Sequence, residues 1–495
     1  MHIELPSDEL LLGGALLLIA GVLGAGLADR VRVPSLLLFL GIGMAIGDDG
    51  ADLISLSDPE LTQALAIAAL VIILYEGGLS IRLLQARRVA APALCLATIG
   101  VFVTAGVVAL VAAALLDVDT TTALLVGAVV SSTDAAAVFS ALRRVVVPRR
   151  LGSLLEVESG ANDPMAVMLT VGLLAVWEGD PGGADWVIFG LRNMVGGLII
   201  GAAIGWIGAR VLSRVHLATA SLYPVLAVGL AGLAYGVGAG LESSGFLAVY
   251  VCGIVVGDRA PAQRRAVLGF LQALASTAQI GLFLLLGLLV FPSRLDEEAL
   301  GALGVAMALV LIARPLAVLL SVVWFGYSRQ ELALVSWAGL RGAVPIVLAT
   351  FPVTQGHPDG QLIFDVVFFV VIVSVLVQGF TLEPLVRRLG LAAEPPSIET
   401  VAEALPLDAP GAQALEIEVG SSARIVGRRL SEVHLPYEAR VAVVLRGRDV
   451  VVATGQTAIE AGDRLVVFAP AQPRLLVALQ DWVADPAPST SQRGD

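Results

Sequence analysis

The sequence predicts an all-α polytopic membrane protein that carries a small soluble α+β domain near its C-terminal end. Of the 495 residues, 57% are hydrophobic and only 15% are charged, which is more apolar than a water-soluble fold of this length requires. Runs of about 20 apolar residues, the length that spans a bilayer core, recur through the first part of the chain. Beyond residue 390 the pattern changes to short alternating segments, which are typical of β-strands.

The apolar runs divide into thirteen predicted spanning helices. Every second connection is rich in Arg, and the intervening connections are acidic or polar. Because Arg-rich loops stay in the cytoplasm, the N-terminus is expected outside and the C-terminus inside. One missed or extra helix would break this alternation, which supports the odd count. The predicted helices cover residues 10–28, 33–47, 60–80, 90–116, 120–142, 153–177, 186–209, 218–240, 244–257, 266–291, 298–325, 331–352 and 361–386.

The order of short and interrupted helices indicates two inverted six-helix repeats, with the seventh helix as a linker. The second and ninth helices, 33–47 and 244–257, are both short. The fifth helix is interrupted at Ser131–Asp134 and the twelfth at Gly339–Pro345. Paired interruptions in corresponding helices are the best sequence indication of the binding site in an inverted-repeat transporter.

Four segments follow from the composition. They are a transmembrane domain at 1–389, a Pro- and acid-rich linker at 390–412, a soluble domain at 413–483 and a disordered tail at 484–495. The soluble domain is expected to contain the strands ALEIEV, RVAVVLR, DVVVAT and DRLVVFA, a short helix around 427–433 and a closing helix at 474–482.

Composition also argues against several classes of function. The net charge of −12 disfavours a nucleic-acid partner. All 30 basic residues are Arg, so neither a phosphate-binding Lys nor a Schiff-base Lys is present. The sequence shows no nucleophile–base–orienter set, so it is not expected to be an enzyme. The four histidines show no metal-ligand spacing, and we expect surface positions and no transition-metal site for His2, His216, His357 and His434.

The strongest functional signal is the motif ESGANDP inside the predicted helix at 153–177. It places Glu158, Ser159, Asn162 and Asp163 at membrane depth, beside a Gly and a Pro. Ionisable groups there normally lie on an ion or proton path. Glu158 and Asn162 share one helical stripe, and Ser159 and Asp163 share the next. The alternative is a polar network that only fastens helices together, which four polar groups beside a Gly and a Pro make the weaker interpretation.

Arg341, in the interrupted twelfth helix, is a permanent cation that would be costly to bury without a carboxylate. We expect it to pair with Glu158 and to leave Asp163 as the titrating group. A proton and a monovalent cation would then compete for one carboxylate, which gives an electroneutral one-for-one exchange. Arg314 lies mid-membrane without an evident partner, and we interpret it as structural.

Two further acids adjoin this region. Asp134 follows Ser131–Thr133, and the segment reads as the start of a half-helix, with a hydroxyl cap and an acid in the first turn. The broken backbone could also turn carbonyl oxygens toward a dehydrated cation. Glu76 is either a further acid of the path or a membrane-boundary residue paired with Arg82.

The motifs ESGANDP, SSTDAAAVFSALR, YEGGLS and GLRGAVPIVLATFP resemble those of monovalent cation:proton antiporters of the NhaP-type branch, over essentially all of residues 1–390. The soluble segment resembles the TrkA-C, or RCK-C, domain of potassium-transport proteins, an arrangement that points to the potassium/proton subgroup. The resemblance implies a homodimer in a bacterial inner membrane that works by alternating access. It implies K⁺ or Na⁺ and H⁺ as substrates and no cofactor, and a nucleotide enters only by analogy as an effector of the soluble domain.

The resemblance also implies roles for individual residues. Asp163 would bind both proton and cation, and the Asn162–Asp163 pair matches the electroneutral branch. Ser159, Glu76 and the Thr133 backbone would help to coordinate the cation. The supporting network would comprise Asn162, Glu158 and Arg341, with Asp134 at the helix crossing.

Two alternatives from other classes stay open. TrkA-C-like domains also regulate cation channels, and a vestigial transporter core could act as an ion or pH sensor. Internal symmetry with midplane carboxylates, and the lack of a TVGYG-like filter, favour an exchanger over a channel. The intact acid–amide–Arg set argues against a decayed core.

Overall fold

The computed structural model divides into two compact units, residues 1–392 and 393–495. The described residues are 6–31, 34–47, 50, 59–81, 83–142, 145–179, 183–215, 217, 219, 221–259, 264–289, 295–392, 412–419, 423, 425–447 and 449–470. Nearly all of the predicted linker, the predicted closing helix at 474–482 and the predicted tail lie outside them.

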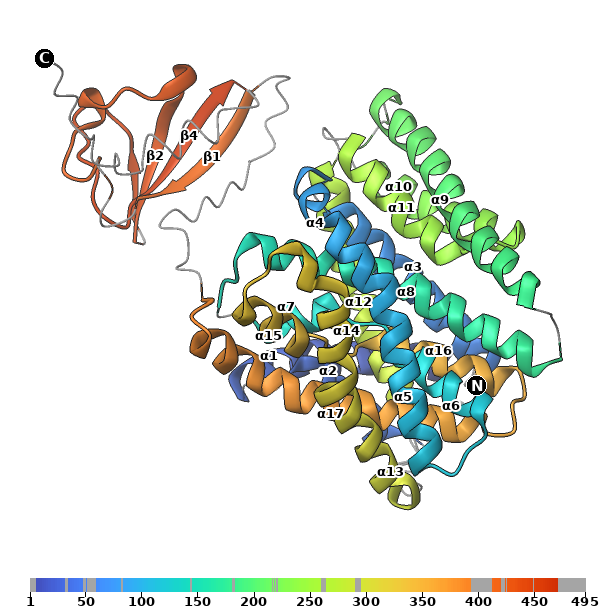
Figure 1. Ribbon diagram of the computed structural model, residues 1–495. Helices are drawn as coiled ribbons and strands as arrows, with labels where there is room; N and C mark the ends of the chain where they lie inside the picture. The colour runs from blue at the N-terminus through green and yellow to red at the C-terminus, as the bar shows by residue number, and fades with distance from the viewer. Residues whose placement is uncertain are drawn as a thin grey trace, which may run out of the picture. The chain divides into compact units, whose positions relative to one another are not determined.

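The first unit is helical (Figure 1). Within its described part, eight helices are long and apolar enough to cross a membrane, and shorter apolar helices cover Ser35–Ile46, Thr120–Val129 and Ala343–Thr354. A polytopic membrane protein is therefore confirmed, while the count of thirteen spans and the inverted repeat stay predictions. The helices are α1 (Pro6–Val31), α2 (Ser35–Ile46), α3 (Pro59–Ser80), α4 (Leu83–Cys95), α5 (Val101–Leu115), α6 (Thr120–Val129), α7 (Ala135–Ala141), α8 (Arg149–Trp177), α9 (Gly183–Arg214), α10 (Leu222–Gly240), α11 (Gly245–Arg259), α12 (Arg264–Leu288), α13 (Leu295–Ala308), α14 (Arg314–Val322), α15 (Arg329–Trp337), α16 (Ala343–Thr354) and α17 (Gly360–Arg388).

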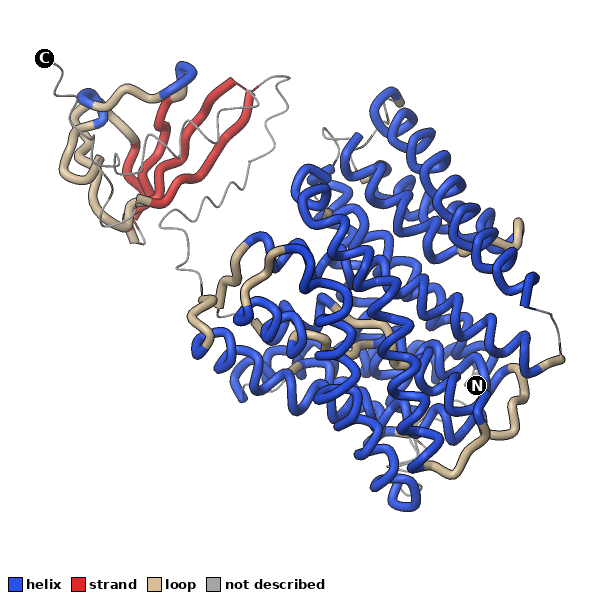
Figure 2. The backbone as a smooth tube through the Cα atoms, in the orientation of Figure 1, coloured by secondary structure: helices blue, strands red, loops and turns tan. Residues whose placement is uncertain are grey.

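Two helices are interrupted where the sequence predicts, and the extended stretches are visible between helical turns in Figure 2. The Asp134 N–H donates to the Leu340 carbonyl at 2.9 Å, so the two breaks touch through their backbones. The predicted hydroxyl cap of α7 is wrong in detail, because Asp134 itself is the N-cap. Its Oδ1 accepts from the N–H groups of Ala136 and Ala137 at 2.8 and 3.2 Å, and a carboxylate also suits the positive end of the helix dipole.

Two π-helical turns interrupt otherwise continuous helices. One, η1 (Leu96–Gly100), joins α4 to α5, and the other, η3 (Leu309–Ala313), joins α13 to α14. A π turn adds one residue to the helical repeat and so rotates everything that follows it. Arg314 is the first residue after η3, so this turn sets the direction of its side chain.

Close backbone contact fixes α11 against α3. A Cβ added at Gly78 would lie 2.3 Å from the Tyr250 carbonyl oxygen, and one added at Gly253 would lie 2.5 Å from that of Tyr75. Small residues allow this approach between helices in a membrane. The pair α3–α11 therefore forms one firmly packed wall.

The second unit contains a four-stranded antiparallel sheet in the order β1–β4–β2–β3. The predicted strands are confirmed as β1 (Ala412–Glu418), β2 (Arg440–Arg446), β3 (Asp449–Val452) and β4 (Arg464–Pro470). The predicted helix at 427–433 is wrong, since only a 3₁₀ turn at Leu430–Glu432 forms. Gly427 has φ +82°, and the N–H groups of Gly427 and Leu430 donate to the carbonyls of Ile459 and Thr457, so the segment pairs with a distant one where a helix would need internal bonds.

A buried carboxylate ties the turn before β4 to β2. Asp463 accepts from Nε and Nη2 of Arg446, each at 2.8 Å, and from the Glu460 N–H at 2.8 Å. Burial acts to raise the pKa of Asp463, but these hydrogen bonds and the Arg446 charge outweigh it and hold the pKa below its usual value.

This geometry predicts an acid-dependent loss of stability. Because the Asp463 pKa is lower in the folded chain, its contribution is fully present above the unfolded value of about 4 and is lost as the pH falls through the folded value. Asp463→Asn should cost about 1–3 kcal/mol near neutral pH and flatten this acid response. Hydrogen exchange of β4 in the full chain would measure both effects. Asp449→Asn, at an exposed position of the same sheet, is the control, and equal behaviour of the two variants would contradict the prediction.

Candidate functional site

The central polar motif lies on α8, which runs unbroken from Arg149 to Trp177 despite Pro164. Its four polar side chains, Glu158, Ser159, Asn162 and Asp163, are all buried. Pro164 has no N–H, so it leaves the Gly160 carbonyl without its helical donor. The motif is therefore a buried polar surface on a continuous helix.

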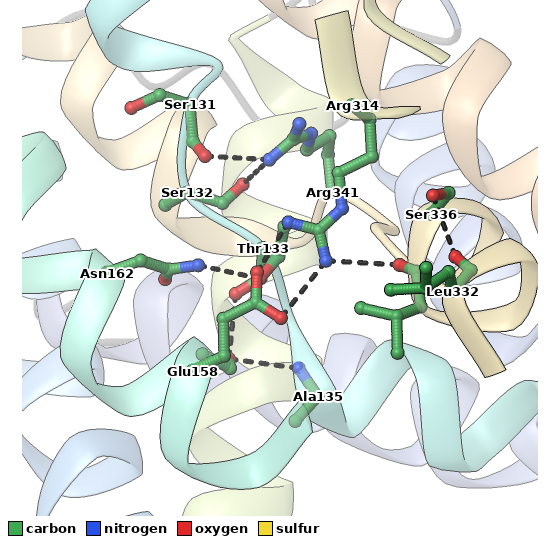
Figure 3. Close-up of polar contacts among 12 residues, drawn as sticks. Ser131, Ser132, Thr133, Ala135, Glu158, Asn162, Arg314, Leu332, Ser336 and Arg341 are labelled. Atoms are coloured by element: carbon green, nitrogen blue, oxygen red, sulfur yellow. Dashed lines mark hydrogen bonds and ion pairs between the residues drawn. The ribbon is translucent and has the colours of Figure 1, made fainter. Parts of the chain in front are cut away.

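Two of these side chains hold the broken helix α6–α7 against α8. Ser159 Oγ donates to the Thr133 carbonyl at 2.7 Å and accepts from the Ala135 N–H at 3.0 Å. Asn162 Nδ2 donates to Thr133 Oγ1 at 2.7 Å. Figure 3 shows Thr133 between the two helices. The carbonyl and the side-chain hydroxyl of Thr133 are thus both bound to α8.

Glu158 is paired with Arg314, and the predicted pairing with Arg341 is wrong. Arg314 Nη1 donates to Glu158 Oε1, and Nη2 donates to Oε2 at 3.0 Å and to the Val335 carbonyl at 3.2 Å. The side chains are 4% and 1% exposed. Gly339 makes room, because a Cβ there would lie 2.6 Å from Arg314 Nε. Glu158 is therefore the partner that the sequence did not reveal for Arg314.

Arg341 is fully buried and binds backbone oxygens instead. Its Nη1 donates to the Ser131 carbonyl at 2.8 Å and to the Ser132 carbonyl (Figure 3). These carbonyls follow the C-terminal end of α6, where the helix dipole favours a cation. The Arg341 N–H donates to Ser374 Oγ at 3.2 Å. Arg341 therefore binds carbonyls that follow the C-terminal end of α6, and Asp134 caps the N-terminal end of α7. The two residues occupy the two sides of the same break.

Asp163 is the carboxylate of the motif that takes no part in the contacts described above. It is 6% exposed, and its Oδ1 has no hydrogen-bond partner among the described residues. Asp134, by contrast, is committed to its cap and lies against Gly342, where an added Cβ would come within 1.7 Å of Oδ2. Glu158 is committed to Arg314.

A cavity of about 220 Å³ adjoins Asp163. It brings together four of the predicted residues, namely Glu76, Asp134, Ser159 and Asp163, with Glu76 Oε1 accepting from Ser80 Oγ at 2.7 Å. The other four predicted residues, Thr133, Glu158, Asn162 and Arg341, are not in its lining. Arg82, the alternative partner of Glu76, lies outside the described residues.

Two cavity residues come from the opposite helices. Tyr250 on α11 and Gln279 on α12 also line the cavity. The sequence gave no signal for Tyr250, which stands alone in the apolar run GFLAVYVCG.

The predicted surface positions of the histidines hold only in part. His434 is exposed, whereas His357 is buried and its ring centroid lies 4.6 Å from that of Trp177. His357 Nδ1 accepts from the Asp359 N–H at 3.1 Å. The surface prediction for His357 is therefore wrong, because the Trp177 ring packs against it. His2 and His216 lie outside the described residues.

Comparison with known proteins places this site in a family. The sodium/hydrogen exchanger transmembrane family model matches residues 14–388. The chain belongs to the sodium/hydrogen exchanger family. A TrkA-C domain model matches residues 414–474 of this exchanger, so the sequence resemblance to an antiporter with a TrkA-C domain is confirmed.

Relatives extend the match over nearly the whole exchanger. The K⁺/H⁺ antiporter NhaP2 of Shewanella oneidensis is 38% identical over 491 residues, which cover 97% of this chain and 84% of the relative. The K⁺/H⁺ antiporter NhaP of Alkalimonas amylolytica is 42% identical, over 80% of this chain and 69% of the relative. The structure of the sodium proton antiporter MjNhaP1 from Methanocaldococcus jannaschii superposes with a TM-score of 0.70 at 24% identity. It covers 78% of this chain and all of that one, and it shows the same fold.

Removal of Arg314 should destabilise the exchanger strongly. Arg314→Ala leaves Glu158 buried without its cation, at a cost of about 3–5 kcal/mol, which should appear as a large fall in the apparent melting temperature. Adding Glu158→Gln should recover much of the loss, because the stranded charge disappears.

The matched comparison is Arg341→Ala, which strands carbonyl oxygens and no carboxylate. Its loss should not be recovered by Glu158→Gln. Recovery by Glu158→Gln in the Arg341 background, and none in the Arg314 background, would contradict the observed pairing.

Proposed function

We propose that this exchanger moves K⁺ against H⁺ across a bacterial cytoplasmic membrane, with Na⁺ as the second candidate cation. The relatives named K⁺/H⁺ antiporters support the choice of K⁺. The observation that carries the proposal is the buried Asp163 carboxylate, which lines the cavity and keeps one oxygen without a hydrogen-bond partner among the described residues.

Proton and cation compete for Asp163 in this proposal. A buried carboxylate is costly as a bare anion, so it is stabilised either by a bound proton or by a bound cation. Glu158 takes no part in the competition, because Arg314 neutralises it. The Asp163 carboxylate is then neutralised in either loaded state, and one H⁺ exchanges for one monovalent cation without net charge movement.

Oxygen ligands for a dehydrated cation are available next to Asp163. The Ser159 hydroxyl donates to Thr133 and accepts from Ala135, which leaves one lone pair, since a hydroxyl has two. The Thr133 carbonyl likewise has a second lone pair, and Glu76 lines the same cavity. Asn162 acts indirectly by holding Thr133 in place.

Alternating access of a homodimer, with the N-terminus outside, completes the transport proposal. The cavity lies toward the ends of α3 and α8 that adjoin Arg-rich connections, and it is lined there by Ser80, Ile81 and Glu156. By the positive-inside rule this is the cytoplasmic side. The cavity is then the inward-facing half of the path.

The TrkA-C match supports a further proposal, in which the C-terminal domain regulates transport. The domain would respond to a small cytoplasmic molecule, for which a nucleotide is the candidate by analogy.

Substitution of Asp163 tests the exchange. In proteoliposomes with an imposed pH gradient, the wild type should show K⁺-dependent proton flux whose initial rate is the same with and without a membrane potential. Asp163→Asn should abolish the flux while the protein still folds, because a neutral amide cannot exchange a proton for a cation. Asp365→Asn removes a buried acid of α17 that does not line the cavity, and it should keep the flux.

Full flux in Asp163→Asn would refute the mechanism, and a flux that changes with membrane potential would refute the stoichiometry. Cation conductance without proton coupling would identify a TrkA-C-regulated channel instead.

Deletion of residues 393–495 tests the regulatory role. Residues 1–392 and 393–495 form two separate compact units. The truncated exchanger should therefore still transport K⁺, with an altered response to pH or to added nucleotides. Complete loss of flux in a truncation that keeps the wild-type melting temperature would show that the domain is part of the transport machinery.

A further inference from the structure

A tyrosine hydroxyl without a partner lies in the cavity that adjoins Asp163. Tyr250, on α11, is 5% exposed, and its Oη has no hydrogen-bond partner among the described residues. It lines the cavity together with Asp163 and Ser159. Buried tyrosine hydroxyls normally find a partner, so this group is available to something that enters the cavity.

The position of this hydroxyl is set by contact with α8. A Cβ added at Gly160 would lie 2.2 Å from Tyr250 Oη and 2.1 Å from Cζ. The tip of the ring therefore rests directly on the backbone of Gly160, which lies between Ser159 and Asp163 in the motif. Gly160 and Asp163 are three residues apart and share a helix face.

The backbone that carries the ring is also held in place. The Tyr250 carbonyl touches the backbone of α3 at Gly78, and one turn later Gly253 packs on the Tyr75 carbonyl. The hydroxyl is therefore presented by a firmly packed wall, and a preorganised ligand spends little entropy on binding.

We propose that Tyr250 Oη is a direct ligand of the cation bound at Asp163, supplied from the α11 wall, beside the ligands on α8. This inference rests on the exchange function proposed above. A hydroxyl oxygen offers two lone pairs and carries no charge. It can therefore replace one water of the cation without changing the net charge of the site. When Asp163 is protonated, the same oxygen can accept a hydrogen bond from the carboxyl O–H.

Tyr250→Phe in the full chain tests this assignment, because it keeps the ring on Gly160 and removes only the oxygen. The K⁺ concentration for half-maximal flux should rise about tenfold, equivalent to ~1.4 kcal/mol, while the maximal rate stays within about twofold. The thermal stabilisation that added K⁺ gives to the solubilised protein should shrink in parallel, which provides a readout independent of transport.

Tyr75→Phe is the matched control. Tyr75 is also a fully buried tyrosine whose hydroxyl has no partner among the described residues, but it does not line the cavity. Its removal should leave the half-maximal K⁺ concentration unchanged.

The outcomes separate this inference from the function on which it rests. If the wild type shows no K⁺-dependent proton flux, the proposed function fails. If the wild type is active and Tyr250→Phe matches Tyr75→Phe in K⁺ affinity and in K⁺-induced stabilisation, the ligand assignment is overturned. A lower maximal rate at unchanged affinity would also overturn it, since the hydroxyl would then act in the movement and not in binding.

Discussion

The ion pair between Arg314 and Glu158 determines the character of the whole site. Both groups are almost completely removed from solvent, where either charge alone would cost several kcal/mol. Each is therefore tolerable only with the other, and the bidentate geometry leaves neither carboxylate oxygen free. The pair depends in turn on the backbone around it, because η3 directs Arg314 and Gly339 leaves it the space to pass. The consequence is that of the two buried acids on α8, Glu158 is fixed and Asp163 is not.

The crossing of the broken helices balances its own charges. Broken helices expose carbonyl oxygens at one end and N–H groups at the other. Arg341 occupies the first end and Asp134 the second, while the Asp134 N–H and the Leu340 carbonyl bind each other. One cation and one anion therefore lie at the two dipole ends of the α6–α7 break. Asp134 is committed to a helix end in this way, and Asp163 is left as the carboxylate for which proton and cation compete in the proposed exchange.

The sequence was informative wherever local chemistry decides the outcome. The interruptions at Ser131–Asp134 and Gly339–Pro345 and the four strands of the C-terminal sheet were all predicted, because turn residues and alternation are local signals. The partner of Glu158 was not. The pairing depends on the rotation introduced by a π turn and on the space that glycine leaves at position 339. Neither can be recognised from the sequence around Arg314. Tyr250 could not be predicted either. The hydroxyl of a tyrosine in an apolar run becomes available to a ligand only when the fold places a cavity beside it.

A neutral ligand from the second wall has a consequence for how occupancy and movement are linked. Asp163 supplies a carboxylate from the α8 side, and Tyr250 supplies an uncharged oxygen from the α11 side. A cation between them is attracted to both walls, whereas a proton is covalently bound to one of them. The two loaded states are then equal in net charge and differ in how strongly they join the walls. If the walls separate during transport, the cation-loaded state must lose the Tyr250 oxygen and the proton-loaded state loses at most one hydrogen bond. Selection among monovalent cations would arise at this step, from the cost of replacing that oxygen by water, and not from the charge of the site.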